Sequence, residues 1–156
     1  NQGIESRSHN DIVGMNWRMT VVAGAIGRIQ LTRLPQWTAM RQENASFLTS
    51  RLEAEQGLSL PTRKSGIDHA FHQFTIGVNP RIRGALLDYL GSCGVQTGIY
   101  YPTPCHRLPS FQKGAGVLPE TDLAARSVLS LPVHPFLETE DLTRVADAVL
   151  TFCAGV

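Results

Sequence analysis

The stretch HAFHQFTIGVNPRIRGALLDYLG, residues 69–91, changes its hydrophobic period part-way along. Ahead of Asn79 the period is two, which places one set of residues on a single face of a strand: Ala70, His72, Phe74, Ile76 and Val78. Asn79 and Pro80 form a typical helix start, and Ile82, Leu86 and Leu90 then recur at helical spacing. We therefore expect a strand followed directly by a helix.

Similar patterns continue on both sides of this stretch. Alternation predicts strands at residues 95–101 and 129–133, and helical spacing predicts helices at 20–34, 35–56 and 121–128. Pro35 is expected to end or kink the first helix, and Thr139 to cap a last helix whose start is acidic. This order predicts an α+β fold, a small mixed or antiparallel sheet with packed helices, in one domain over residues 1–156 after a lead-in segment at 1–19.

The composition excludes several classes of protein. Lys and Arg number 14 and Asp and Glu 13, a net charge of +1, which is too balanced for a chain whose main partner is nucleic acid. No apolar run approaches the roughly 20 residues of a membrane span, and no signal peptide opens the sequence, so we expect a cytoplasmic protein. The three cysteines are far apart, which predicts reduced thiols, and the five histidines show no metal-site spacing.

Two histidines begin the quoted stretch on opposite faces of the predicted strand. His72 shares the apolar face, and we expect it to be a core histidine with satisfied hydrogen bonds. His69 lies on the other face beside Phe71, where it either contacts a ligand or remains an ordinary surface residue.

Asn16 and Arg18 precede the first predicted helix, which Thr20 is expected to cap. An amide, a guanidinium and the free N–H groups of a helix start together suit a phosphate dianion. The alternative is that Asn16 makes a turn and Arg18 is a surface charge.

The segment YYPTPCH, residues 100–106, is the most unusual local string. On a strand Tyr100 and Tyr101 point to opposite faces, so at least one is available to stack on a flat ring or donate its hydroxyl. His106 follows on a loop stiffened by prolines, where its imidazole is available for a hydrogen bond. The alternative is an edge strand that runs into a rigid loop. Cys105 is a weak candidate nucleophile, because sequence neighbours rarely face each other on an extended loop.

Three ordered strings together resemble the carboxy-terminal part of the DegT/StrS-type sugar aminotransferases, pyridoxal phosphate enzymes of fold type I. They are GMNWRMTVVAGAIGRIQLTRLPQW at 14–37, HAFHQF at 69–74, and TGIYYPTPCH at 97–106 with LPETDLAARSVLSLPVHPFL at 118–137. The resemblance covers nearly the whole chain. It implies the small domain of an enzyme that uses pyridoxal phosphate to move an amino group from glutamate to a nucleotide-linked ketosugar, in a homodimer with sites at the interface.

The same resemblance assigns roles to single residues. It implies that Asn16 and Arg18 bind the cofactor phosphate, that Tyr100 and Tyr101 contact the nucleotide, and that His69 and His106 lie near the sugar. Relatives often have histidine where this chain has Tyr100, which bears on the preferred nucleotide or sugar.

The family's cofactor-binding lysine lies upstream of the string that begins at residue 14, in a larger domain. The only lysines here, Lys64 and Lys113, match no family motif, and the chain begins with Asn1 rather than Met. We therefore expect a carboxy-terminal domain that is inactive alone and that, because of its apolar helix surface, either self-associates or is marginally stable. The alternatives are a non-catalytic binding domain of the same fold, a related enzyme acting on a non-sugar cyclic ketone and, with least support, a small hydrolase.

Overall fold

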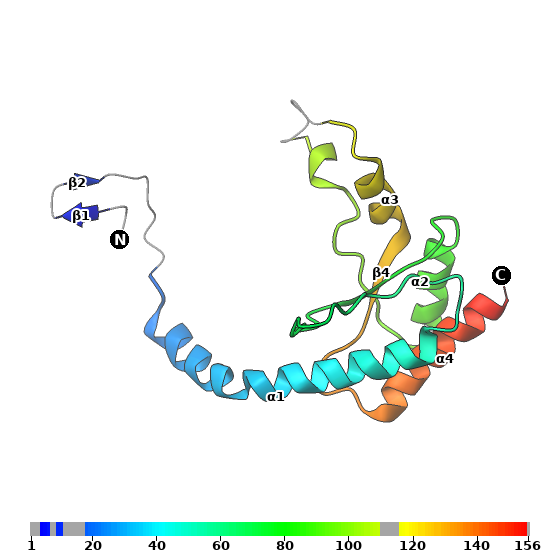
Figure 1. Cartoon of the computed structure of the whole chain (residues 1–156), viewed down its shortest axis with the longest axis horizontal. Coiled ribbons are helices and arrows are strands. Elements are labelled where there is room, and N and C mark those ends of the chain that lie inside the picture. The colour runs from blue at the N-terminus through cyan, green and yellow to red at the C-terminus, as the bar shows by residue number, and fades with distance from the viewer. Residues whose placement is uncertain (1–3, 7–8, 11–17, 110–115, 156) are drawn as a thin grey trace. The chain divides into compact units, whose positions relative to one another are not determined.

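The computed structural model describes residues 4–6, 9–10, 18–109 and 116–155. Over these residues the chain forms four α-helices and two two-stranded antiparallel sheets (Figure 1). This confirms the predicted α+β class. Internal contacts divide the chain into two units, Asn1–Pro35 and Gln36–Val156. Contacts define compactness rather than independent folding, so a single domain over residues 1–156 stays a prediction.

The first unit contains a short hairpin and the beginning of the longest helix. β1 (Ile4–Ser6) pairs with β2 (His9–Asn10), and α1 (Val21–Leu52) follows. Thr20 caps α1 as predicted, because its Oγ1 accepts the N–H of Ala23 at 3.2 Å. The apolar stripe predicted for this helix is not buried here: Val22, Ile26 and Ile29 are 70%, 53% and 60% exposed.

α1 is a single helix of 32 residues that contains Pro35, so the predicted division into two helices is wrong. Proline at this position lacks the N–H that would bond the carbonyl of Leu31. One missing backbone hydrogen bond does not end the helix, and α1 continues past Pro35 to Leu52. Beyond the proline, Leu48 and Leu52 are buried as the periodicity predicts.

The second unit is built on strands β3 (Phe74–Gly77) and β4 (Val128–Leu131), which pair antiparallel with Thr75 opposite Ser130. Single bridges to Ser59 and Gly98 extend the two edges. The strand predicted at 95–101 is therefore reduced to one residue, since only Gly98 exchanges N–H···O bonds with Ser130, at 3.0 and 2.8 Å. Pro132 has no N–H to donate, so the pairing between Gly98 and Ser130 does not continue past Leu131.

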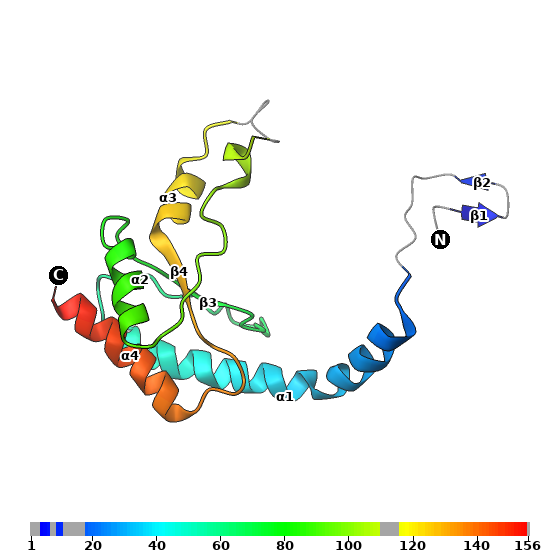
Figure 2. The same ribbon diagram turned by 180° about the vertical axis from the view of Figure 1, so that it is seen from behind.

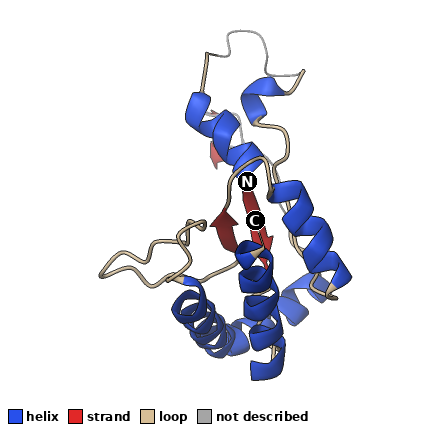
Figure 3. Ribbon diagram, turned by 90° about the vertical axis from the view of Figure 1, so that its right-hand side faces the viewer, coloured by secondary structure: helices blue, strands red, loops and turns tan. Residues whose placement is uncertain are grey.

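The core lies between the strands and the helices of the second unit. α2 (Arg83–Ser92) contacts β4 and lies beside α4 (Thr139–Ala154), as Figures 1 and 2 show from opposite sides. The following large side chains are fully buried: Leu48, Leu52, Phe74, Ile76, Leu86, Leu90, Leu129 and Val149. Each contributes about 1.5–3 kcal/mol relative to an exposed position. Figure 3 shows strands of the second unit lying among its helices and loops.

Two helix starts differ from the sequence expectation. The N-cap of α4 is Glu138 rather than Thr139: the Glu138 side chain accepts the N–H of Asp141, and the Asp141 carboxylate accepts that of Glu138. This reciprocal pair satisfies two N–H groups, whereas the side chain of a threonine cap alone would satisfy one. At α2 the Asn79 side chain accepts the N–H of Arg81 at 3.0 Å and forms a turn, and the cap itself is Ile82.

None of the helices in the described ranges has the length and apolar character that a membrane crossing requires. Within those ranges, no three His, Cys, Asp or Glu side chains gather as metal ligands would. Cys93, Cys105 and Cys153 are free thiols.

Candidate functional site

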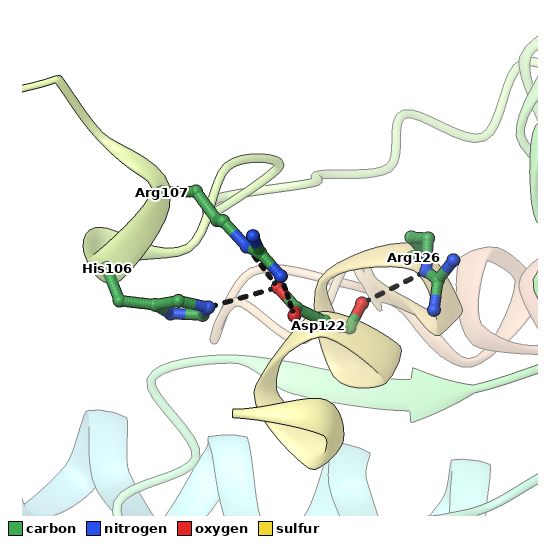
Figure 4. A network of polar contacts seen from close by, with 4 residues as sticks. All are labelled: His106, Arg107, Asp122 and Arg126. Atoms are coloured by element: carbon green, nitrogen blue, oxygen red, sulfur yellow. Dashed lines mark hydrogen bonds and ion pairs between the residues drawn. The ribbon is translucent and has the colours of Figure 1, made fainter. Parts of the chain in front are cut away.

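Asp122, on α3 (Pro119–Ser127), anchors the loop that contains the 3₁₀ turn Cys105–Arg107 (Figure 4). Its carboxylate accepts two hydrogen bonds from Arg107, from Nε at 3.2 Å and from Nη2 at 2.6 Å. Two parallel bonds fix the relative orientation of both groups, which a single bond does not. Arg126 adds a third bond, from its Nε to the Asp122 carbonyl at 3.2 Å.

His106 is turned toward the same carboxylate. Its side chain is only 9% exposed, and its Nε2 lies 3.1 Å from Asp122 Oδ1 (Figure 4). The buried Nε2 does not meet the directional requirement of a hydrogen bond, so the contact is one of proximity and, when the ring is protonated, of charge. His106 and Arg107 therefore both hold the loop against α3.

The cluster changes the ionisation of its members. The two hydrogen bonds from the Arg107 guanidinium lower the pKa of Asp122 below its ordinary value of 3.8, and the charges of Arg107 and His106 act in the same direction. The same bonds raise the pKa of Arg107. Asp122 is therefore ionised at neutral pH, and its carboxylate remains an acceptor for both N–H groups of Arg107.

His69 lies in a turn that interrupts the predicted strand. Phe71 has a positive φ of 41°, unusual for a residue with a side chain, and its N–H donates to His69 Nδ1 at 3.0 Å. The two rings lie 4.2 Å apart. Arg41 Nη1 donates to the carbonyls of Phe71 and His72 at 3.3 and 3.4 Å, which holds this backbone in place.

Because of this turn, the side chains ahead of β3 do not follow the alternation predicted for a strand. The strand begins at Phe74 rather than Ala70, so Phe71 is buried while His72 is exposed. The prediction that His72 is a core histidine is therefore wrong, because the strand's alternation does not extend back to it. His69 is exposed, with its Nδ1 already occupied by the Phe71 N–H.

Tyr100 and Tyr101 are 58% and 75% exposed, so neither belongs to the core. The ring of Tyr100 lies over Gly98: a Cβ placed on that glycine would come within 2.9 Å of Tyr100 Cε2. Glycine at 98 therefore permits the position of the tyrosine ring. Tyr100 also lines a cavity of about 600 Å³, whose wall includes Ser130 and Gln73.

Arg18 belongs to the first unit, where it is exposed and lies just ahead of α1. Asn16 lies outside the described residues. Of the residues predicted from sequence, the second unit contains Tyr100, Tyr101, His106 and His69. The cavity wall includes Tyr100, whereas His106 lies in the Asp122 cluster and His69 in the Phe71 turn.

Sequence reasoning missed Asp122 and Arg107. They are 15 residues apart across the proline-rich loop, and no periodic pattern relates two positions at that separation. The only local signal is an acidic residue in the first turn of a helix that begins with proline, and that signal predicts a helix start rather than an anchor.

The described parts of the three strings occupy defined places in this structure: residues 18–37 lead into α1 and form its first half, residues 69–74 form the turn before β3, and the third string forms the loop before α3 and continues through α3 into β4. The model of the DegT/DnrJ/EryC1/StrS aminotransferase family matches residues 1–150. The chain belongs to this family. The resemblance inferred from the strings is thereby confirmed.

Two curated relatives illustrate the match. The dTDP-3-amino-3,4,6-trideoxy-alpha-D-glucose transaminase of Streptomyces venezuelae is 34% identical over 152 residues, 96% of this chain and 40% of the relative. The UDP-N-acetyl-3-dehydro-alpha-D-glucosamine 3-aminotransferase of Acidithiobacillus ferrooxidans is 33% identical over 150 residues, again 96% of this chain and 40% of the relative. The family member thus spans about 40% of these relatives and corresponds to their carboxy-terminal part.

Solved structures agree with this placement. DesV of Streptomyces venezuelae, in complex with a ketimine intermediate, has a TM-score of 0.89 and 33% identity over all of this chain and 42% of its own. NtdA of Bacillus subtilis, with bound cofactor PMP, has a TM-score of 0.82 and 27% identity over 96% of this chain and 36% of its own. The fold of this DegT-family chain is therefore that of the matching part of known aminotransferases.

Proposed function

We propose that this chain is the carboxy-terminal part of an enzyme that transfers an amino group from glutamate to a nucleotide-linked ketosugar. The observation that carries the proposal is the near-complete match of the chain to the carboxy-terminal part of relatives named as dTDP- and UDP-sugar aminotransferases. The intact enzyme would act as a homodimer whose sites lie at the interface.

The residues ahead of α1 suit the phosphate of pyridoxal phosphate. Arg18 is an exposed guanidinium next to the start of a long helix, and guanidinium groups and helix N-termini both favour phosphate dianions. Asn16 and Arg18 would hold this group. When bound, the cofactor supplies an electron sink for the amino transfer. Neither Lys64 nor Lys113 lies in a family motif, so the cofactor-binding lysine would come from a segment outside this chain.

Four residues of the second unit would contact the acceptor. Tyr100 and Tyr101 present exposed rings, which suits stacking on a nucleotide base. His106 and His69 would lie near the sugar. The Asp122 cluster supports His106 and Arg107, so Asp122 would act as a positioning residue for that loop.

A chimaera tests the proposal directly. This chain replaces the matching carboxy-terminal part of the Streptomyces venezuelae transaminase, and transfer of ¹⁵N from glutamate to the relative's ketosugar is measured. We expect the chimaera to retain the cofactor and to transfer nitrogen, and the 156-residue chain alone to do neither. Arg18→Ala and Asn16→Ala should weaken cofactor retention in the chimaera, whereas Arg81→Ala, which changes an exposed arginine elsewhere, should not.

Two results would contradict the proposal. Borohydride reduction of the isolated chain with pyridoxal phosphate could leave one stoichiometric adduct on Lys64 or Lys113, which would show a complete cofactor site in this chain. The chimaera could also fold and bind the cofactor but transfer no nitrogen to any nucleotide-linked ketosugar. That result would exclude such sugars as the acceptor and would favour a non-sugar ketone.

A further inference from the structure

Two neighbouring residues of α1 fasten the turn that precedes β3. Gln42 Nε2 donates to the carbonyl of His69 at 3.1 Å. Arg41 Nη1 donates to the carbonyls of Phe71 and His72 at 3.3 and 3.4 Å. Because both donors extend from one helix, their spacing is fixed before they reach the turn. α1 therefore holds the turn backbone on both sides of Phe71.

The backbone conformation held in this way is strained. Phe71 has a φ of 41°, a region that residues with a side chain adopt only where their surroundings impose it. Its ring is 4% exposed and lies 6.4 Å from the ring of Phe74, so the ring is anchored in the core. Burial of the ring and the bonds from Arg41 offset the strain, and together they fix the shape of the turn.

The turn also determines which nitrogen of His69 carries the proton. Nδ1 accepts the N–H of Phe71 at 3.0 Å, and a ring nitrogen that accepts a hydrogen bond is unprotonated. The neutral ring therefore has its proton on Nε2. The carboxylate of Asp68, next in the chain, accepts the side-chain amide of Gln42. His69 is exposed, and its Nε2 forms no hydrogen bond with a residue in the described ranges, which leaves this N–H as a donor for a ligand.

A second turn of the same construction provides a comparison within this chain. His134 Nδ1 accepts the N–H of Phe136 at 3.3 Å, and Asn44 of α1 donates to the His134 carbonyl at 2.9 Å. Here the phenylalanine is 72% exposed, and among the described residues other than glycine only Phe71 has a positive φ. The turn at His69 is therefore the strained one of the two, and such strain is frequent at functional sites.

We propose that Arg41 and Gln42 are positioning residues that make His69 a hydrogen-bond donor toward the acceptor sugar. The inference rests on the proposed function, in which His69 lies near that sugar. Hydroxyl and keto oxygens of a sugar accept hydrogen bonds, and a donor held in a fixed direction orients the ligand that it binds. With Nδ1 occupied by the Phe71 N–H, His69 orients the substrate and takes no proton from it.

The first test determines the tautomer of His69 in the 156-residue chain. Long-range ¹H–¹⁵N NMR spectra of histidine rings distinguish a proton on Nε2 from one on Nδ1. At alkaline pH, where the rings are neutral, we expect the Nε2–H form at both His69 and His134. Arg41→Gln combined with Gln42→Ala should give a mixture of tautomers at His69 and leave His134 unchanged, which reports that the second unit is folded. Arg51→Gln, a change to another arginine of the same helix, should alter neither.

The second test measures binding in the chimaera with the Streptomyces venezuelae transaminase. Without an amino donor no nitrogen is transferred, so calorimetry with the relative's ketosugar measures equilibrium affinity alone. His69→Asn preserves the turn, because an asparagine carbonyl accepts the N–H two residues on, but it has no group at the place of Nε2. We expect about three- to tenfold weaker binding and an unchanged unfolding temperature. His134→Asn makes the same change at the other turn and should bind as the parent does.

Three results would overturn the proposal, and they differ in what else they affect. A proton on Nδ1 of His69 in the parent chain is the first, and this measurement holds even if a variant fails to fold. The second is ketosugar binding by the parent chimaera that His69→Asn leaves unchanged, or weakens no more than His134→Asn does, and it leaves the proposed function intact. The third is a parent chimaera that binds no ketosugar, which contradicts the proposed function itself and this inference with it.

Discussion

Arg107 and Asp122 are joined by two hydrogen bonds, of 3.2 and 2.6 Å, across 15 residues of sequence. The contact connects the end of the 3₁₀ turn Cys105–Arg107 to the first turns of α3. Because the intervening chain includes Pro109 and Pro119, closing the loop at this point restricts the backbone that carries His106.

Asp122→Asn should remove a pH dependence from the stability of the second unit. The folded pKa of Asp122 lies below its ordinary value of 3.8, so its stabilising contribution is complete above that value and is lost as the pH falls through the folded pKa. The parent should therefore lose more stability than the variant between about pH 5 and 2.5. Thermal unfolding across this range measures the difference.

Asp147→Asn is the matched control. Asp147 also pairs with an arginine, Arg51, but it is a more exposed carboxylate on α4 and is remote in sequence from the loop. Because Asp147→Asn keeps Asp122, it should still show the loss of stability at low pH that Asp122 causes. Parallel pH curves for the parent and Asp122→Asn would rule out the anchor.

Gly98→Ala should displace the ring of Tyr100 with little change in stability. The new Cβ would lie 2.9 Å from Cε2 of an exposed ring, which can rotate away. We expect a stability change of less than about 1 kcal/mol and a clear shift of the Tyr100 ring resonances in NMR spectra. Gly84→Ala, at a helical position with nothing within 4 Å of the new Cβ, provides the control. Unchanged Tyr100 resonances in Gly98→Ala would show that the ring does not lie over this glycine.

Local features of this chain could be predicted from its sequence, whereas contacts between distant residues could not. The helix stripes at Leu48 and Leu86 and the alternation at Phe74 and Ile76 predicted buried faces correctly, since each reflects one element facing one core. The alternation failed at His72, because Phe71 adopts a positive φ held by Arg41, a residue 30 positions away. Periodicity contains no information about such a distant contact.

In the candidate site, too, single residues in a local string were predicted and contacts between separate elements were not. Tyr100 and Tyr101 were identified from a conspicuous string, and both are exposed. The contacts of Asp122 with Arg107 and of Arg41 with the turn before β3 were missed, because their members come from separate elements and meet only in the folded chain. At α4 the acidic start was recognised, but the reciprocal bonds make Glu138 the cap.

Glu138→Ala should destabilise the second unit by about 1 kcal/mol, because it breaks one half of the capping box and leaves an N–H of α4 unpaired. Thr139→Ala is the matched control, since the cap function predicted for Thr139 is performed by its neighbour, and its effect should stay within about 0.5 kcal/mol. Urea unfolding measures both. A larger loss of stability in Thr139→Ala than in Glu138→Ala would show that Thr139, and not Glu138, caps the helix.

The chain should self-associate through the apolar side chains of the first half of α1. Val22, Ile26 and Ile29 are more than half exposed on this helix, and apolar surface gathered at one place favours burial against a second molecule. Sedimentation velocity should show a weight-average mass that rises with concentration, and Ile26→Glu with Ile29→Glu should lower it toward the monomer mass of 17.1 kDa. Gln30→Glu adds a negative charge to the same helix without removing an apolar side chain, and it should leave the association largely intact. A parent that stays monomeric at high concentration would mean that these side chains tolerate water without a partner.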